Sequence, residues 1–129
     1  MTPVAQLLLV EDDAEIRRGL MRGLAELGHA VVGVASGYEA LKEIVEQRPD
    51  LVVLDLDLPV ASGFRVLEVL KGDPATAAVP VLVVTALDFA EAKAAAQAGA
   101  DAFLTKPFDA AELAARAERL LAGAGTAPA

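Results

Sequence analysis

Short apolar runs alternate along the chain with longer stretches in which apolar and polar residues mix. The runs are rich in valine and leucine and contain few polar positions: 6–10, 30–34, 51–54, 81–84 and 102–105. Such runs predict strands that are buried on both faces, as in a parallel sheet. The longer stretches repeat apolar residues every three or four positions, which predicts helices over 14–27, 38–47, 64–70, 90–98 and 110–121. In the first of these helices, the apolar residues that fall on one face are Ile16, Leu20, Leu24 and Leu27.

Residues that cap helices stand at the ends of the predicted segments. Polar N-cap candidates precede the five helices: Asp13, Ser36, Ser62, Asp88 and Asp109. Three of them are followed three residues later by glutamate, which is the spacing of a capping box. Gly28 and Gly99 follow the first and fourth helices, where a left-handed C-cap residue is expected.

The order of the predicted elements indicates the fold class. Five strands alternating with five helices predict an α/β sandwich, in which helices cover both faces of a parallel sheet through right-handed connections. The chain has 129 residues, which fits a single domain. We expect that domain to cover residues 1–122 and the segment 123–129, rich in glycine and alanine, to form a flexible tail.

Charge and composition narrow the classes of partner. The chain carries 11 lysines and arginines against 19 aspartates and glutamates, a formal net charge of −8. This charge argues against nucleic acid and anionic membranes as direct partners. The chain has no cysteine, which excludes disulfides, thiolate catalysis and cysteine-ligated metal sites. No apolar run approaches the ~20 residues of a membrane span and no secretion signal is visible, so we expect a cytoplasmic location.

Chemically active residues directly follow four of the five predicted strands. The four segments are 11–13 (Glu-Asp-Asp), 55–59 (Asp-Leu-Asp-Leu-Pro), 85–86 (Thr-Ala) and 106–108 (Lys-Pro-Phe). Because binding groups gather at the carboxyl ends of parallel strands, we expect these segments to meet at one edge of the sheet. Carboxylates this close repel one another, and a hard divalent cation resolves the conflict because Mg²⁺ prefers oxygen ligands. The acidic segments therefore predict a Mg²⁺ site.

Asp55 is the candidate nucleophile at this edge, because it follows the central and most buried predicted strand. A carboxylate that attacks a phosphoryl group is one anion approaching another, so charge neutralisation limits the rate. Mg²⁺, the ammonium of Lys106 and the hydroxyl of Thr85 would supply it, and an aspartyl phosphate is a recognised covalent intermediate. Each segment alone is a weak signal, but all four in order at successive strand ends favour phosphoryl transfer.

These motifs resemble the receiver domains of bacterial two-component response regulators over about residues 5–122. The motifs that carry the resemblance are Leu-Val-Glu-Asp-Asp (9–13), Asp-Leu-Asp-Leu-Pro (55–59), Val-Thr-Ala (84–86) and Lys-Pro-Phe (106–108). The resemblance implies a flavodoxin-like (βα)5 fold whose five-stranded parallel sheet has the order 2-1-3-4-5. It also implies that Asp55 receives a phosphoryl group from a histidine kinase or a histidine phosphotransfer protein. The chain would then be a signalling phosphoacceptor, not an enzyme that acts on other substrates.

Carried over by position, the resemblance implies a role for each residue of the site. The implied Mg²⁺ ligands are the carboxylates of Glu11, Asp12 and Asp55 and the backbone carbonyl of Asp57. The residues implied in phosphoryl binding and switching are Thr85, Ala86, Lys106 and Phe103. The peptide bond before Pro107 is expected to be cis, which is accessible to an X-Pro bond.

The resemblance also indicates how the signal would leave the domain. Phe103 falls at the position of an aromatic switch residue, so we expect its ring to turn inward when Thr85 moves toward the phosphoryl group. A downstream protein would then bind the surface made by the fourth helix, the fifth strand and the fifth helix. The segment 71–76 and Ala102 are more similar to stand-alone and hybrid-kinase receivers than to DNA-binding ones. A single-domain regulator is therefore favoured, and a piece of a longer regulator stays open.

Three other functions stay open on the sequence. Asp55 and Asp57 also fit the Asp-x-Asp of haloacid-dehalogenase-like Mg²⁺ phosphatases, although that motif usually follows the first strand. A flavodoxin-like electron carrier has the same fold, but the acidic segment after the first strand would repel the phosphate of FMN. A pseudo-receiver, which is an interaction module that is never phosphorylated, would not need these acids together with Thr85 and Lys106.

Overall fold

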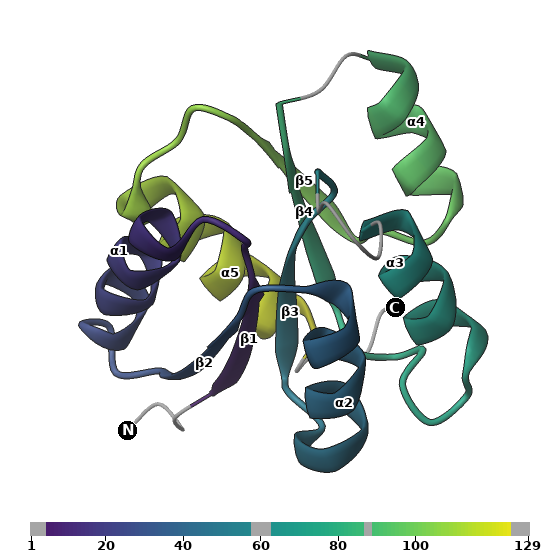
Figure 1. Ribbon diagram of the computed structural model, residues 1–129, viewed down its shortest axis with the longest axis horizontal. Helices are drawn as coiled ribbons and strands as arrows, with labels where there is room; N and C mark the ends of the chain where they lie inside the picture. Colours follow the sequence, from purple (N-terminus) through teal and green to yellow (C-terminus); the bar gives the residue numbers. More distant parts are fainter. Residues whose placement is uncertain (1–4, 58–62, 87–88, 125–129) are drawn as a thin grey trace.

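The computed structural model describes residues 5–57, 63–86 and 89–124 of the chain. Strands and helices alternate along it (Figure 1): β1 (Gln6–Val10), α1 (Ala14–Ala25), β2 (Ala30–Val34), α2 (Gly37–Gln47), β3 (Leu51–Asp55), α3 (Gly63–Gly72), β4 (Val81–Thr85), α4 (Phe89–Gln97), β5 (Ala102–Thr105) and α5 (Ala110–Ala124). Every strand begins at the residue predicted from the sequence, and β3 and β4 each extend one residue further.

The strands form one parallel sheet of order β2-β1-β3-β4-β5, which confirms the predicted topology. Helices α1 and α5 cover one face of the sheet, and α2, α3 and α4 cover the other (Figure 1). The strand order reverses between β1 and β3, which are neighbours in the sheet although β2 separates them in the sequence. In open α/β sheets, ligands bind just beyond the carboxyl ends of the strands at such a reversal.

Burial on both faces explains the apolar runs of β1, β3 and β4, whereas the edge strands β2 and β5 are only partly buried, contrary to the prediction. Along β1, Leu7 and Leu9 pack under α1 and α5, whereas Leu8 and Val10 pack under α2 and α3. The central strands β3 and β4 are buried at every position. Side chains alternate between the faces of a strand, so a strand with helices on both sides needs an apolar residue at each step.

The predicted caps hold wherever the structure describes them. The side chains of Asp13, Ser36 and Asp109 each accept a hydrogen bond from the backbone N–H three residues later. Gly28 and Gly99 have φ angles of 92° and 109°, the left-handed conformation that glycine adopts without strain. The other two predicted N-caps, Ser62 and Asp88, lie outside the described residues.

Two predicted boundaries differ in detail from the structure. Helix α1 ends at Ala25, so Leu27 lies beyond it and is 48% exposed. Ile16 is 47% exposed because it lies about 80° around the helix from Leu24, at the margin of the apolar face. At the other end of the chain, α5 continues through residues 123 and 124, and the rest of the predicted tail, 125–129, lies outside the described residues.

Among the helices in the described part of the chain, none combines the length and the apolar character that a membrane crossing requires.

Candidate functional site

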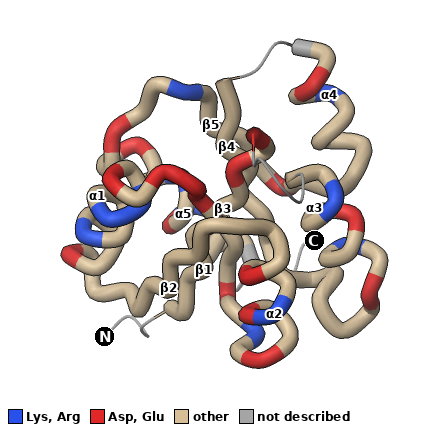
Figure 2. The backbone as a smooth tube through the Cα atoms, viewed as in Figure 1, with Lys and Arg blue, Asp and Glu red and all other residues tan. Residues whose placement is uncertain are grey.

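The register of the sheet brings the four predicted segments to one edge. Val10 pairs with Leu54, so the residues after β1 lie beside the end of β3. Asp55 pairs with Val84 and Thr85 pairs with Thr105, which carries the same alignment across β4 and β5. Figure 2 shows the acidic segment between β1 and α1 at this carboxyl edge. The sheet therefore gathers side chains that are up to 95 positions apart, from residue 11 to residue 106.

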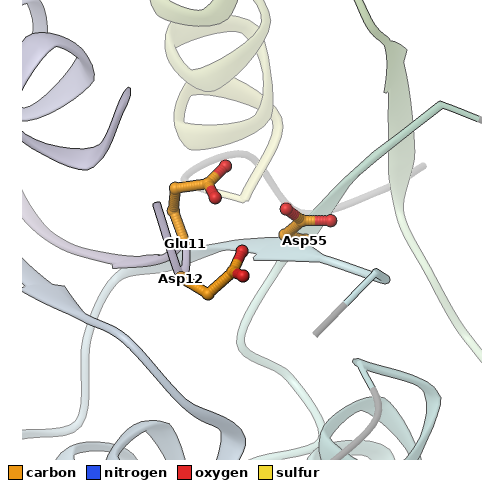
Figure 3. Close-up of side chains that lie close together, drawn as sticks. All are labelled: Glu11, Asp12 and Asp55. Carbon is orange, nitrogen blue, oxygen red and sulfur yellow. The ribbon is translucent and has the colours of Figure 1, made fainter. Parts of the chain in front are cut away.

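Three carboxylates converge at this edge. Glu11, Asp12 and Asp55 each offer an oxygen, and these oxygens all lie within 4.8 Å of one another. Figure 3 shows the side chains pointing toward a common space between the ends of β1 and β3. A set of hard oxygen donors with one side open to solvent is the environment that Mg²⁺ prefers, because this ion keeps several of its water ligands. The donor chemistry of the site therefore fits Mg²⁺.

Asp55 is buried and held from two sides. Its side chain is 2% exposed, and its two oxygens have different partners. Oδ2 accepts a hydrogen bond from the ammonium of Lys106 at 2.9 Å, and Oδ1 accepts one from the backbone N–H of Asp57 at 2.8 Å. Charge-assisted hydrogen bonds of this kind fix the orientation of a carboxylate. Asp55 therefore presents its carboxylate at the edge in one defined geometry.

Glu11 is the second buried acid, at 3% exposure. The pKa of its carboxyl group is raised from 4.5 to about 7, and burial is the largest cause. The charge of Asp55 and a hydrogen bond with Asp12 contribute to this rise, whereas the hydrogen bond from the Asp13 N–H opposes it. The nearby ammonium of Lys106 opposes it as well. Glu11 therefore keeps its proton to a higher pH than an exposed glutamate does.

Lys106 supplies the positive charge of the site. Burial lowers the pKa of its ammonium, but the hydrogen bond to Asp55 and the surrounding carboxylates outweigh that effect and raise it. The lysine therefore stays charged at physiological pH. The bond between Lys106 and Pro107 is cis, which confirms the prediction.

Thr85 and Ala86 complete the edge at the end of β4. The side chain of Thr85 is fully buried, and its hydroxyl has no hydrogen-bond partner among the described residues. Buried polar groups nearly always form a hydrogen bond. An unpaired hydroxyl next to the acidic edge is therefore available to bind a ligand. The Ala86 N–H makes only a long contact, 3.4 Å, with Oδ2 of the exposed Asp57.

Phe103 lies further from the acids, in the middle of the edge strand β5. It is half-buried and packs against the core under α2, α3 and α4. Its carbonyl accepts a hydrogen bond from Nη1 of Arg116 on α5, at 2.6 Å. Phe103 is therefore in contact with the sheet face next to α4 through its ring and with α5 through its backbone. Its role as a switch stays a prediction, as does the predicted ligand role of the Asp57 carbonyl.

Two residues that contact the site were not indicated by the sequence. A side chain at Gly63, the first residue of α3, would begin 2.6 Å from the backbone oxygen of Asp55. Arg17 of α1 donates hydrogen bonds from Nη1 to the carbonyl oxygens of Glu11 and Asp12, at 2.9 and 3.5 Å. For Gly63 the sequence does offer a signal, because this glycine directly precedes the predicted helix 64–70. The contact of Arg17 depends on how α1 lies across the sheet, which no local pattern reveals.

These groups together suit the transfer of a phosphoryl group to a carboxylate. The site has a fixed and buried carboxylate, two further acids that fit Mg²⁺, an ammonium, a free hydroxyl and an exposed backbone N–H. Catalysis of phosphoryl transfer consists mainly of positioning the reactants and neutralising charge, and each of these groups is of a chemical type suited to one or the other.

Comparisons with known proteins agree with this chemistry. The family profile described as the response regulator receiver domain matches residues 7–118. The chain is 39% identical over 122 residues to the transcriptional regulatory protein PrrA of Mycobacterium tuberculosis, and 42% identical over 119 residues to the response regulator MprA of Mycobacterium sp. (strain KMS). These matches cover 94% and 90% of this chain but 52% and 50% of the relatives, so the chain spans about half the length of the curated relatives it matches.

A solved structure gives the same result. The signal receiver domain of a signal transduction histidine kinase from Syntrophus aciditrophicus superposes with a TM-score of 0.88 at 32% sequence identity. The match covers 98% of this chain and 96% of that one. The similarity therefore extends over the whole α/β sandwich, including the edge that carries the acids.

Proposed function

The chain belongs to the response regulator receiver family, and on this basis we propose that Asp55 accepts a phosphoryl group from the phosphohistidine of its partner. A receiver domain implies a histidine kinase as that partner, and a histidine phosphotransfer protein is the second source of a phosphohistidine. The observation that supports the proposal most strongly is the setting of Asp55. It is buried, oriented by Lys106, and within 4.8 Å of two further acids that fit Mg²⁺.

The proposed reaction exchanges one bond to phosphorus for another. A carboxylate oxygen of Asp55 forms an O–P bond, the N–P bond of the phosphohistidine breaks, and its electron pair remains on the imidazole nitrogen. The residues that would hold Mg²⁺ are Glu11, Asp12, Asp55 and, through its carbonyl, Asp57. When bound, the ion neutralises negative charge as the phosphoryl group and the carboxylate approach each other.

The other groups of the edge would stabilise the transferred phosphoryl group. Lys106, which donates to Asp55 before the reaction, would turn its ammonium to a phosphoryl oxygen. The unpartnered hydroxyl of Thr85 and the N–H of Ala86 would donate to the remaining oxygens.

The proposed output is a change in the surface of α4, β5 and α5. Thr85 pairs with Thr105 of β5, so a movement of Thr85 toward the phosphoryl group would alter the packing beside Phe103. Phe103 is linked to α5 through Arg116, which connects the edge strand to the helix beside it. A downstream protein that prefers the altered surface would then shift the equilibrium between the two states.

Partners and location follow from the same proposal. The net charge of −8 favours a protein as the direct partner over nucleic acid or an anionic membrane. The transcriptional role in the name of PrrA belongs to a longer protein, and for residues 1–122 we propose a receiver domain that acts in the cytoplasm. It would catalyse only its own phosphorylation and dephosphorylation.

The decisive experiment uses acetyl phosphate, a small phosphoryl donor, with Mg²⁺ and measures the intact mass of the protein. We expect a labile gain of one phosphoryl group in the wild type and in Glu15→Gln, which changes an exposed acid of α1. Asp55→Asn and a sample with EDTA should show none. A stable wild-type mass under all conditions would contradict the proposal and favour a pseudo-receiver.

Two further measurements separate the remaining alternatives. Continuous release of inorganic phosphate from a generic phosphomonoester, lost in Asp57→Asn, would favour a haloacid-dehalogenase-like phosphatase.

For the output surface, amide chemical shifts are recorded before and after phosphorylation. We expect changes in α4, β5 and α5, and changes confined to the acidic edge would contradict the switch.

A further inference from the structure

The loop that carries the acidic pair is tied down by a side chain from the helix that follows it. Nη1 of Arg17 donates to the carbonyl oxygen of Glu11 at 2.9 Å and more weakly to that of Asp12 at 3.5 Å. At the other end of the loop, the N–H of Glu11 donates to the carbonyl of Val34 in β2 at 3.0 Å. The backbone of the two acids is therefore held from β2 and from α1 at once.

Holding this backbone fixes the directions of the two Cα–Cβ bonds and so limits where the two carboxylates can lie. The Cα–Cβ bond of a residue follows its backbone, so the side chains of Glu11 and Asp12 are aimed by the position of the loop. Two carboxylates brought together repel each other, and a loop without restraint would relax by turning one of them away. The partners that orient metal ligands contribute to metal affinity for this reason.

On its way to the loop, the stem of Arg17 passes close to a glycine of β2. Helix α1 packs on β2, and Gly33 of β2 pairs with Leu9, on the face that α1 covers. A Cβ atom at Gly33 would lie 3.1 Å from both Cγ and Cδ of Arg17, and it would also collide with the sulfur of Met21. Glycine weakens a strand, so its presence in β2 calls for a close approach of this kind.

The position of Arg17 does not suit the stability of α1 itself. The helix begins at Ala14, so Arg17 lies in its first turn, where the positive end of the helix dipole disfavours a cation. The guanidinium is directed back past the N-terminus to the carbonyls of the loop. This geometry indicates a role in the loop and not in the helix.

We propose that Arg17 is a positioning residue for the acidic pair and that Gly33 provides the space for its stem. The two residues set the affinity of the edge for Mg²⁺, and thereby the Mg²⁺ concentration at which Asp55 is phosphorylated. The effect on phosphorylation rests on the function proposed above, whereas the effect on Mg²⁺ affinity is measured on the unphosphorylated protein.

The experiment compares Mg²⁺ dissociation constants, followed by amide chemical shifts of the loop. Arg17→Met removes the donors and keeps an apolar stem, and we expect it to weaken Mg²⁺ binding on the order of 10-fold, the lower end for outer-sphere partners of metal ligands. Gly33→Ala should also weaken Mg²⁺ binding, and by no more than Arg17→Met does. Arg18→Met, at the exposed next position, and Gly19→Ala, where a Cβ would meet nothing within 4 Å, are matched controls that should bind as the wild type does.

A double variant tests whether Gly33 acts through Arg17. If it does, Arg17→Met/Gly33→Ala binds Mg²⁺ as weakly as Arg17→Met alone, whereas independent effects would add. The Mg²⁺ dependence of phosphorylation by acetyl phosphate gives a second readout. We expect the half-saturating Mg²⁺ concentration to rise in Arg17→Met and the rate at saturating Mg²⁺ to stay unchanged, which a general loss of structure would not produce.

The outcomes distinguish the two proposals. If the wild type binds Mg²⁺ and is phosphorylated, but Arg17→Met differs from it by less than about twofold in Mg²⁺ affinity, the role of Arg17 is overturned. Additive losses in the double variant would overturn the role of Gly33. If the wild type binds Mg²⁺ but never gains a phosphoryl group, the proposed function fails. The Mg²⁺ affinities of the wild type and of Arg17→Met then still test the role of Arg17. A wild type without Mg²⁺ affinity would overturn both.

Discussion

Replacing Glu11 with glutamine should remove a large pH dependence from the stability of the protein. The pKa of Glu11 is raised from 4.5 to about 7 in the folded state, chiefly by burial. The folded state therefore binds the proton more tightly than the unfolded state does. Stability is highest below the unfolded pKa and is lost as the pH rises through the folded one. Glutamine does not ionise, and its side-chain oxygen can still accept the hydrogen bond from the Asp13 N–H.

The size of the effect follows from the shift in pKa. One pKa unit corresponds to about 1.4 kcal/mol, so the whole shift is worth about 3 kcal/mol. Between about pH 5.5 and pH 8.5, the wild type should lose roughly 2 kcal/mol of unfolding free energy through this group. Because the Glu11→Gln variant lacks this ionisation, its unfolding free energy should rise relative to the wild type by the same amount over that range.

Urea unfolding at several pH values, with EDTA present, measures this difference. The matched control is Glu15→Gln, which removes the same formal charge from an exposed position in the first turn of α1. Parallel pH profiles for the wild type and Glu11→Gln would refute the reasoning, because burial of Glu11 would then not be raising its pKa. Added Mg²⁺ gives a second check. The ion competes with the proton for the carboxylate, so its stabilisation of the wild type should grow with pH.

Three further predictions concern other residues of the structure. Thr85→Val should stabilise the unphosphorylated protein by about 1 kcal/mol in urea unfolding, since it removes a buried hydroxyl without a partner, and should slow phosphorylation by acetyl phosphate. A destabilised variant would mean that the hydroxyl is satisfied. Gly63→Ala should lower the free energy of unfolding by about 1–3 kcal/mol and reduce the phosphorylation rate, because its Cβ would lie 2.6 Å from the rigid backbone oxygen of Asp55. Unchanged stability and rate would show that β3 can shift. Lys71→Met should lower the free energy of unfolding by about 1–3 kcal/mol, because the ammonium forms an ion pair with Asp101 at 2.9 Å and donates to two loop carbonyls. Phosphorylation of this variant should proceed at the wild-type rate. A slower rate would connect this ion pair to the acidic edge.

Much of the fold is determined by local patterns. The strands β1, β3 and β4 are buried at nearly every position because helices cover both faces of the sheet there. The extents of all five strands follow from the sequence to within one residue. Asp13, Ser36 and Asp109 cap helices through hydrogen bonds within three residues, which need no distant partner. Helix ends follow less closely from the sequence, since α1 ends at Ala25 and leaves Leu27 beyond it and 48% exposed.

The members of the site also follow from the sequence, because their chemistry is carried by residue type and by position after a strand. Acids after β1 and β3, a threonine at the end of β4 and a lysine after β5 meet at one edge once the strands are parallel and in the order observed. The order itself came from the resemblance to receiver domains. The register, with Val10 beside Leu54 and Asp55 beside Val84, is a property of the assembled sheet.

The tertiary structure alone decided the electrostatics and the supports of the site. The pKa of Glu11 depends on burial by side chains from other elements, and burial is not a local property of the sequence. Arg17 bonds the acidic loop from α1, and its stem packs against Gly33, sixteen residues later, in the neighbouring strand. Hydrogen bonds and close contacts act over a few ångströms in space, whatever the separation along the chain. The sequence by itself therefore determined which groups the site contains, and the packing of helices on the sheet determined how they are charged and held.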